Sequence, residues 1–182
     1  MDLTGQIIVS MPSLQDERFF KTVIYMCAHS SEGSMGIIIN KKIDYDLYPN
    51  LLEQLGVDKP LNNKLFIRYG GPVESGRGFV LHSDDMIRKE SLNINKGVAL
   101  TSTSEFFDDL ALGNGPKNSI LALGYAGWGP GQLEFEIMQN SWMNLPIDCN
   151  FIFDDNVSNK WNEAYQLIGI DPNSLSSSSG TA

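Results

Sequence analysis

The chain has 182 residues, with 22 acidic and 13 basic side chains, so its formal charge is −9, and apolar residue types make up 42% of it. A chain of this length can bury roughly two-thirds of its unfolded surface, which gives one core that needs neither disulfide nor metal. The apolar fraction excludes an intrinsically disordered chain, and no apolar run reaches the roughly 18 to 20 residues of a membrane-spanning helix.

Short β-branched runs separated by turn residues open the chain. Gln6–Ser10, Thr22–His29 and Met35–Asn40 each have the composition of a strand. The polar connection Ser30–Ser34 joins the second run to the third and is typical of a hairpin turn. These runs therefore predict a largely antiparallel sheet.

The next segment changes to helical spacing and then returns to strands. A short helix is predicted by leucines at helical spacing, with a proline in the first turn and a glycine at the end: Leu47, Pro49, Leu51, Leu52, Leu55 and Gly56. Leu65–Tyr69 and Gly78–His82 then have the composition of strands, on either side of a turn at Gly70–Pro72.

A second helix and a buried strand follow. Ser102–Glu105 has the pattern of a capping box, in which a hydroxyl and a carboxylate bind backbone N–H groups at a helix start, and Gly113 is placed to end that helix. Ser119–Tyr125 has the composition of a buried strand. It leads through the glycine-rich segment Gly124–Gly131 into a helix that ends near Asn140.

The last part of the chain predicts two strands and a helix. Trp142–Asp148 and Cys149–Phe153 are the predicted strands, and Trp161–Ile168 has the apolar spacing of an amphipathic helix that stops at Gly169. We interpret residues 1–172 as a single β-rich α+β domain and residues 173–182 as a flexible serine-rich tail.

Cys27 and His29 are the pair with the clearest potential for chemistry. Residues two apart on a strand point to the same side, and a nearby imidazolium lowers the pKa of a thiol and activates it as a nucleophile. Asp16 or Glu32 could then orient the imidazole. The alternative, which we favour, is that Cys27 is a small core residue and that His29 ends the strand with a hydrogen bond.

The segment Gly124–Gly131 lies between a predicted strand and a predicted helix, an arrangement that can hold phosphate against backbone N–H groups. Its glycine spacing matches neither a P-loop nor the dinucleotide fingerprint, so a rigid packing turn is favoured. A pocket between the sheet and the Gly33–Asn40 hairpin would take its candidate ligand-binding residues from these two segments: Asn40, Gly127, Trp128 and Gly129. For the large aromatic residues we favour core packing over a role in such a pocket.

The remaining charged residues do not indicate a metal, a cofactor or DNA. Asp84 and Asp85 beside His82 are the nearest approach to a metal cluster, and adjacent loop carboxylates are usually solvated, so no metal or cofactor is expected. Glu134 and Glu136 are interpreted as helix-start charges or as partners of a buried Arg. Direct DNA binding is disfavoured because the chain is acidic and its basic residues are scattered.

A set of segments with specific order and spacing spans nearly the whole chain. They are GQIIVSMPSLQDERFF at Gly5–Phe20, VIYMCAH at Val23–His29, GSMGIIIN at Gly33–Asn40, GGPV at Gly70–Val73, RGFVLH at Arg77–His82, LALGYAGWGPGQLEFEI at Leu121–Ile137, NSW at Asn140–Trp142 and LIGID at Leu167–Asp171. In these segments the sequence resembles the AlgH/YqgE family of small bacterial proteins. The resemblance implies a coiled, partly barrel-like sheet with packed helices. Family members are described as candidate transcriptional regulators, with no agreed reaction, cofactor or DNA site.

We therefore expect a non-enzymatic cytoplasmic protein that binds a protein or small-molecule partner and does not associate with a membrane. The two cysteines, Cys27 and Cys149, are each bracketed by apolar residues and suit buried thiols in a reducing compartment. No basic flank precedes an apolar stretch at the N-terminus. The alternative is a thiol-based enzyme or redox sensor that uses Cys27 and His29.

Overall fold

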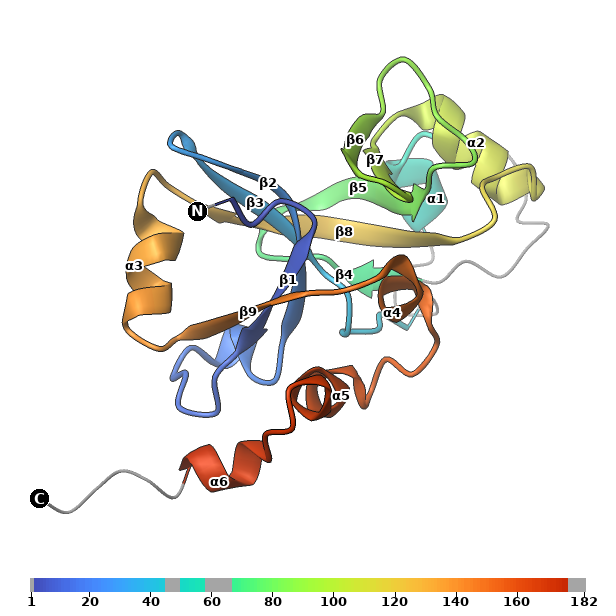
Figure 1. The fold of residues 1–182 in the computed structure, drawn as a ribbon. Coiled ribbons are helices and arrows are strands. Elements are labelled where there is room, and N and C mark those ends of the chain that lie inside the picture. Colours follow the sequence, from blue (N-terminus) through green and yellow to red (C-terminus); the bar gives the residue numbers. More distant parts are fainter. Residues whose placement is uncertain (1, 45–49, 58–66, 177–182) are drawn as a thin grey trace, which may run out of the picture.

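The structure is a computed structural model that describes residues 2–44, 50–57 and 67–176. Its centre is a curled sheet in which β8 crosses the molecule and joins the two halves (Figure 1). Neighbouring strands are antiparallel except for β4, which pairs with β8 in parallel. The described strands are β1 (Gln6–Ser10), β2 (Val23–Ser30), β3 (Gly33–Ile38), β4 (Ile67–Tyr69), β5 (Val73–Ser83), β6 (Leu92–Asn95), β7 (Val98–Thr101), β8 (Ser119–Trp128) and β9 (Trp142–Pro146).

The helices lie around this sheet, which confirms the predicted α+β class. The strand order is β6-β7-β5-β8-β3-β2-β1-β9. The described helical segments are the 3₁₀ turn η1 (Glu17–Phe19), α1 (Leu51–Gln54), α2 (Ser104–Leu112), α3 (Gln132–Met138), α4 (Cys149–Phe153), α5 (Lys160–Leu167) and α6 (Pro172–Ser176). None of those helices has the length and apolar composition needed to cross a bilayer.

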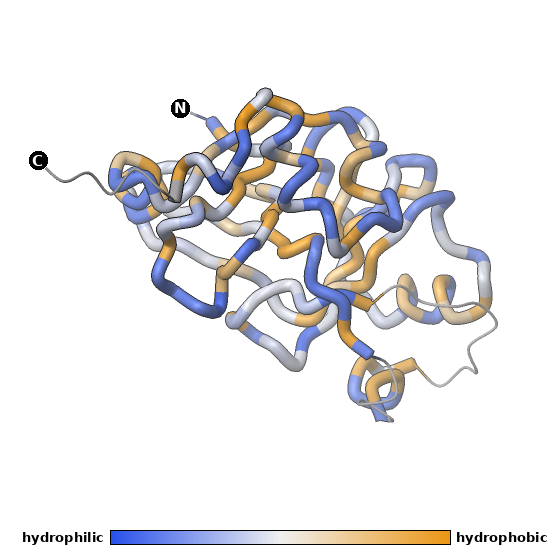
Figure 2. The backbone as a smooth tube through the Cα atoms, turned by 90° about the horizontal axis from the view of Figure 1, so that it is seen from below, coloured by the Kyte–Doolittle hydropathy of each residue, from blue (hydrophilic) through white to orange (hydrophobic). Residues whose placement is uncertain are grey.

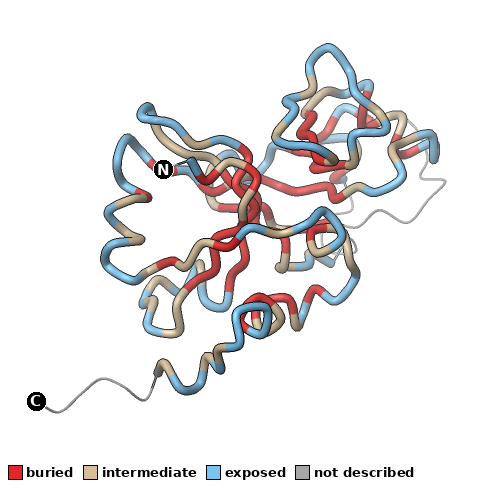
Figure 3. Tube along the Cα trace, in the orientation of Figure 1, coloured by how far each residue is buried: buried red, intermediate tan, exposed pale blue. Residues whose placement is uncertain are grey.

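Both faces of the sheet formed by β1, β2 and β3 are covered, which explains why these strands are continuously apolar. Tyr25 of β2 lies in a hydrophobic cluster with Trp161 of α5, whereas Ile24 and Met26 lie in a second cluster with Leu133 of α3. A strand buried on both faces has no position left for alternating polar residues. Buried positions accordingly follow the central strands (Figure 3), and the outer turns are mainly hydrophilic (Figure 2).

The link between β4 and β5 crosses the face of β8, because these two strands pair with the same residues of β8 from opposite edges. The crossing depends on glycine. A Cβ added at Gly71 would lie 2.1 Å from the carbonyl carbon of Tyr125, and one added at Gly124 would lie 2.4 Å from the carbonyl oxygen of Gly71. Two backbones can approach this closely only where neither carries a side chain.

This crossing changes the interpretation of the glycine-rich segment Gly124–Gly131. The predicted loop is wrong for most of its length, because β8 continues through Trp128 and only the last three residues form the turn before α3. Gly124 therefore lies inside strand β8, where its lack of a side chain lets the β4–β5 link pack closely against the strand. Gly131, with a φ of 71°, is the N-cap of α3.

The predicted strand Cys149–Phe153 is wrong, because these residues form α4. Oδ1 of Asp148 accepts hydrogen bonds from the backbone N–H groups of Asn150 and Phe151, at 2.8 and 3.3 Å. A carboxylate in this N-cap position stabilises a helix start. The helix α2 and its end at Gly113 (φ 80°) are as predicted.

The capping box predicted for α2 at Ser102–Glu105 is not formed. The N-cap residue is Thr103, and its side chain makes no capping hydrogen bond. The Ser102 hydroxyl instead donates to the carbonyl oxygen of Gly78, at 2.6 Å, and so ties the start of α2 to β5.

Two strands, β6 and β7, are absent from the sequence prediction, and they extend the sheet beyond β5. The predicted helix of the leucine-rich segment is confirmed at α1, whereas Leu47 and Pro49 lie outside the described residues. Residues 65–66 of the predicted strand Leu65–Tyr69 and residues 177–182 of the predicted tail also lie outside the described residues. Residues 173–176 belong to α6.

Candidate functional site

Cys27 and His29 do not face each other. The ladder between β2 and β3 shifts register between Met26 and Ala28, which makes Cys27 the extra residue of a β-bulge. A bulge reverses the alternation of side chains beyond it. Cys27 consequently lies in the hydrophobic cluster that includes Tyr25, whereas the His29 ring lies on the other face, against Leu3 and Glu134. The expectation that the pair points to one side is therefore wrong.

The Cys27 thiol lies in the core. The residue is 1% exposed, and its sulfur lies 3.7 Å from the carbonyl oxygen of Tyr25. Burial raises the pKa of the Cys27 thiol from 9.0 to about 12, so the thiol is protonated at neutral pH. This environment suits a packing residue and does not activate a nucleophile.

His29 connects three segments of the fold. Its Nδ1 accepts a hydrogen bond from the backbone N–H of Leu3 (3.4 Å), and its Nε2 lies 3.1 Å from Oε1 of Glu134 on α3. The side chain is 2% exposed. The carboxylate beside the ring is therefore that of Glu134, and neither Asp16 nor Glu32 orients it.

Asn40 also holds backbone together. Its Oδ1 accepts from the N–H of Val23 and its Nδ2 donates to the carbonyl oxygen of Lys21, both at 2.8 Å. Both ends of the amide are thus used within the fold. The structure does not bring Asn40 together with the other predicted ligand-binding residues.

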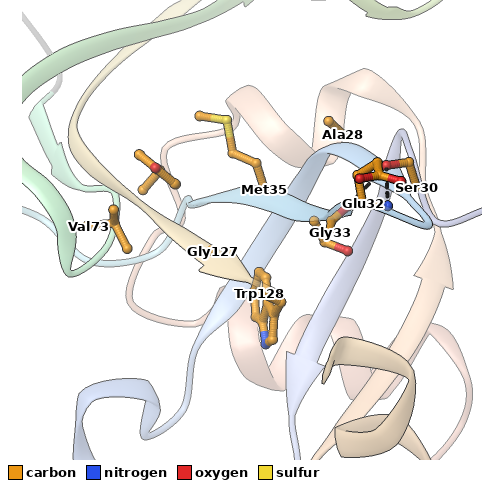
Figure 4. A pocket seen from close by; sticks show the side chains of 10 residues that line it. Ala28, Ser30, Glu32, Gly33, Met35, Val73, Gly127 and Trp128 are labelled. Carbon is orange, nitrogen blue, oxygen red and sulfur yellow. Dashed lines mark hydrogen bonds between the residues drawn. The ribbon is translucent and has the colours of Figure 1, made fainter. Parts of the chain in front are cut away.

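Gly127 and Trp128 line two adjoining hollows, which we call together the Trp128 cleft. The first hollow has a volume of about 440 Å³ and lies beside the β2–β3 turn, where Met35 and Glu32 contribute to its wall (Figure 4). The second has a volume of about 380 Å³. Both hollows share Gly127, Trp128 and Val73 as lining residues.

The second hollow has aromatic, apolar and charged walls. Pro72 and Val73 reach it from the crossing over β8, and η1, α3 and the start of β9 supply the rest. Its lining residues are Leu14, Asp16, Arg18, Phe19, Pro72, Val73, Gly127, Trp128, Gln132, Glu136, Ser141 and Trp142. Gly129 is absent from this lining, and its N–H donates to Oε1 of Gln132 at 3.0 Å.

Glu136 fixes the walls of the second hollow. Its Oε2 accepts hydrogen bonds from Nε1 of Trp128 (2.9 Å) and Nε1 of Trp142 (2.8 Å). Its Oε1 accepts from Nε2 of Gln132 at 2.9 Å. One carboxylate on α3 thereby joins the end of β8 to the start of β9, and the two indoles are held before any ligand arrives.

Sequence reasoning does not find this network. Glu136 is interpreted there as a helix-start charge or as a partner of a buried Arg, and its actual donors are two indoles and an amide. The only signal in the sequence is the proximity of two Trp and two Glu within 15 positions, from Trp128 to Trp142. Their contact depends on how α3 folds back between two strands.

The acidic pair near His82 holds loops together. Oδ2 of Asp84 accepts from the N–H of Gly97 (2.9 Å), and Oδ2 of Asp85 accepts from the N–H of Lys117 (3.0 Å). The His82 ring is buried and its Nε2 lies 2.8 Å from the Thr101 hydroxyl oxygen. Within residues 2–44, 50–57 and 67–176, no three His, Cys, Asp or Glu side chains form a group suited to a metal ion.

Comparisons with known proteins agree on one family. The AlgH-like family model matches residues 7–173. A relative named UPF0301 protein, from Beijerinckia indica, is 48% identical, covering 99% of this chain and 92% of its own length. A second, from Rhodospirillum rubrum, is 44% identical, with 99% and 94% covered.

Two solved structures are similar over nearly the whole chain. The solution structure of the AlgH protein from Pseudomonas aeruginosa has a TM-score of 0.81 at 33% identity, covering 100% of this chain and 97% of that one. A crystal structure of a Corynebacterium diphtheriae protein has a TM-score of 0.71, with 96% and 92% covered. At 17% identity, the second likeness concerns the fold alone.

Proposed function

The chain belongs to the AlgH-like family, and we propose that it is a non-enzymatic binding protein whose ligand site is the Trp128 cleft. The observation that carries this proposal is the fixed state of the cleft walls. Trp128, Trp142 and Gln132 are all hydrogen-bonded to Glu136. Walls that are ordered before binding lower the entropic cost of taking up a ligand.

The chemistry of the thiols favours binding over catalysis. Cys27 is buried with a raised pKa, and His29 is directed to the opposite face of β2. A thiol enzyme built on this pair is therefore not supported. Both cysteines are free thiols, although Cys149 is exposed and the expectation that it is buried is wrong. Because a reducing cytoplasm maintains free thiols, we propose a cytoplasmic location.

Any regulatory role would act through what the cleft binds. The formal charge of −9 opposes direct contact with a nucleic acid backbone. A small molecule or a protein side chain that fills the cleft is compatible with this charge. We therefore propose that regulation, where it occurs, depends on whether the cleft is occupied.

The proposal is tested by replacing a glycine that lines the cleft with a residue whose side chain takes up space there. Gly127 lines both hollows, is absent from the glycines with positive φ, and would carry a Cβ 3.2 Å from the Tyr125 ring. A Gly127→Val side chain would lie beside Tyr125 and Val73 and would occupy part of the cleft where these two residues line the first hollow. Gly76→Val is the matched control, because a Cβ there meets nothing within 4 Å.

The measurement is the melting temperature in the presence of a set of small cationic, neutral and anionic compounds. Bound compounds raise the melting temperature by mass action. We expect stabilising compounds to lose their effect on Gly127→Val and to keep it on Gly76→Val. Equal shifts for all three proteins, or no shift with any compound at millimolar concentration, would reject the cleft as the ligand site.

A further inference from the structure

Three aromatic residues, Phe19, Trp128 and Trp142, line the second hollow of the cleft, which we call the aromatic box. Phe19 and Trp142 lie with ring centroids 5.4 Å apart and planes at 74°, and Trp128 and Trp142 lie 5.9 Å apart at 85°. Trp142 thus packs edge to face with both Phe19 and Trp128, and all three residues line the hollow. A ring face that borders the hollow can attract a cation.

Glu136 makes this box favourable to positive charge. Its hydrogen-bond donors, Trp128, Trp142 and Gln132, are all neutral, so none of them compensates the carboxylate charge. An indole that donates its N–H to a carboxylate is also polarised, which makes its ring face more negative. The hollow therefore combines electron-rich walls with a fixed negative charge.

The basic residue of the same hollow is already engaged. Arg18 donates from Nε to Oδ1 of Asp16 (3.0 Å) and from Nη2 to Oδ2 (2.7 Å), a two-point contact between guanidinium and carboxylate. An anionic ligand would have to compete with Asp16 for this group. Asp16 and Glu136 together exceed the single positive charge of Arg18, and the formal charge of the whole chain is −9.

One of these rings already has a cation of the chain itself beside it. The guanidinium carbon of Arg18 lies 5.6 Å from the centroid of Phe19. The adjoining first hollow adds the carboxylate of Glu32 and the apolar side chains of Met35 and Tyr125. The cleft can thus accommodate a charged group in one hollow and a less polar extension in the other.

We infer that the Trp128 cleft binds a small organic cation, with a quaternary or methylated ammonium group in the aromatic box. This inference rests on the proposed function of the cleft and names its ligand class. Aromatic faces and carboxylates both favour a cation whose charge is spread over methyl groups, because such a cation loses little hydration on entering the hollow.

The test is calorimetric titration of the full chain with three compounds of similar shape: choline, the neutral alcohol in which carbon replaces the choline nitrogen, and the anion trimethylacetate. We expect choline to bind at least about tenfold more tightly than the neutral alcohol, and trimethylacetate to give no heat. Choline binding should also weaken as salt is added, because screening reduces the attraction.

The variant Asp16→Asn tests whether the negative charge beside the hollow contributes to choline binding. Asn can replace Asp as the N-cap of η1, so the turn is kept while the carboxylate charge beside the hollow is lost. We expect choline affinity to fall about fivefold, from the lost attraction and the released Arg18 charge. Glu90→Gln, an exposed change of the same net charge outside the cleft, should leave the affinity unchanged.

The outcomes separate the two proposals. Equal affinity for choline and its neutral isostere, or tighter binding of trimethylacetate, would overturn the cation inference and leave the cleft as a ligand site. Equal losses in Asp16→Asn and Glu90→Gln would also overturn the inference. If none of the three compounds binds, the cation inference is overturned. The proposed function is rejected as well only if none of the compounds tested by melting temperature shifts that temperature.

Discussion

Glu136 is the residue on which the walls of the cleft depend most. Gln in its place keeps the shape but offers one neutral oxygen acceptor, and its NH₂ group would face either the two indole N–H groups or the amide Nε2 of Gln132, which are all donors. We expect Glu136→Gln to lower the free energy of unfolding by about 2 kcal/mol, because buried donors lose a charged acceptor. Urea unfolding followed by Trp fluorescence measures it. Exposed Glu90→Gln is the control, expected within about 0.5 kcal/mol of the parent; equal stabilities of the two variants would contradict the role of Glu136.

The two thiols should react at very different rates. Cys149 is exposed, whereas Cys27 is buried and its pKa is raised to about 12. Because the thiolate is the reacting form, we expect iodoacetamide at neutral pH to modify Cys149 and to spare Cys27 until the protein is unfolded. Peptide mass mapping of the native and urea-treated protein would measure this. Comparable modification of both residues in the native protein would revive the thiol hypothesis.

At the scale of elements, the close crossing of the β4–β5 link over β8 predicts that replacing Gly71 by Ala costs more stability than the same change at two glycines with open space, Gly76 and Gly131. Gly76→Ala meets nothing within 4 Å and should be neutral within about 0.5 kcal/mol. Gly131→Ala has equal space but a φ of 71°, and should cost about 1 kcal/mol. Gly71→Ala would place Cβ 2.1 Å from backbone and should cost at least about 3 kcal/mol.

Chemical denaturation of the three glycine variants tests this order. The account requires Gly71→Ala to be the least stable, or to fail to fold, while Gly76→Ala behaves as the parent. A Gly71→Ala protein as stable as Gly131→Ala would mean that the two backbones do not cross as closely as described.

Much of the element pattern can be predicted from sequence, because local spacing and caps produce it. The apolar runs of β1 to β3, the helix α2 and its end at Gly113 all carry strong local signals. The hairpin β6–β7 does not, since Leu92–Asn95 alternates between apolar and polar residues for only four positions, and two of them are Asn, which is depleted in strands. The strand predicted at Cys149–Phe153 fails because Asp148 caps a helix there, a contact that apolar content alone does not reveal.

The candidate site is less predictable, because its parts meet only through tertiary packing. The sequence identifies Gly127 and Trp128 as candidate ligand-binding residues, and both line the cleft. It cannot identify the bulge at Cys27, since one extra residue in a strand leaves no mark on composition. That single residue reverses the side to which His29 points, and with it the expected chemistry.

At the scale of the whole molecule, stability should fall in alkaline solution. Burial raises the pKa of Cys27 from 9.0 to about 12, that of Tyr165 from 10.0 to about 12, and that of Tyr25 in the same direction. The folded state therefore favours the neutral forms. This contribution is complete below pH 9, where both states are protonated, and is lost as the pH rises toward 12 and the unfolded chain ionises first.

Urea unfolding at neutral pH and at points between pH 9 and 12 measures this loss. Cys27→Ala removes one of the three contributions, so its stability should decline less steeply than that of the parent. Cys149→Ala, which removes an exposed thiol, should follow the parent. A decline of the same steepness in Cys27→Ala would show that the buried thiol does not ionise differently in the two states.

The central claim, that the Trp128 cleft takes up a ligand between prearranged indoles, is tested most directly by the side-chain N–H signals of the three Trp residues in an ¹⁵N–¹H spectrum. Trp128 and Trp142 donate to Glu136, whereas Trp161 donates to the carbonyl oxygen of Ser10 in a separate part of the core. On titration with choline, we predict that the Trp128 and Trp142 signals move together with a single affinity while that of Trp161 stays fixed. Movement of all three signals, or of Trp161 alone, would contradict the claim.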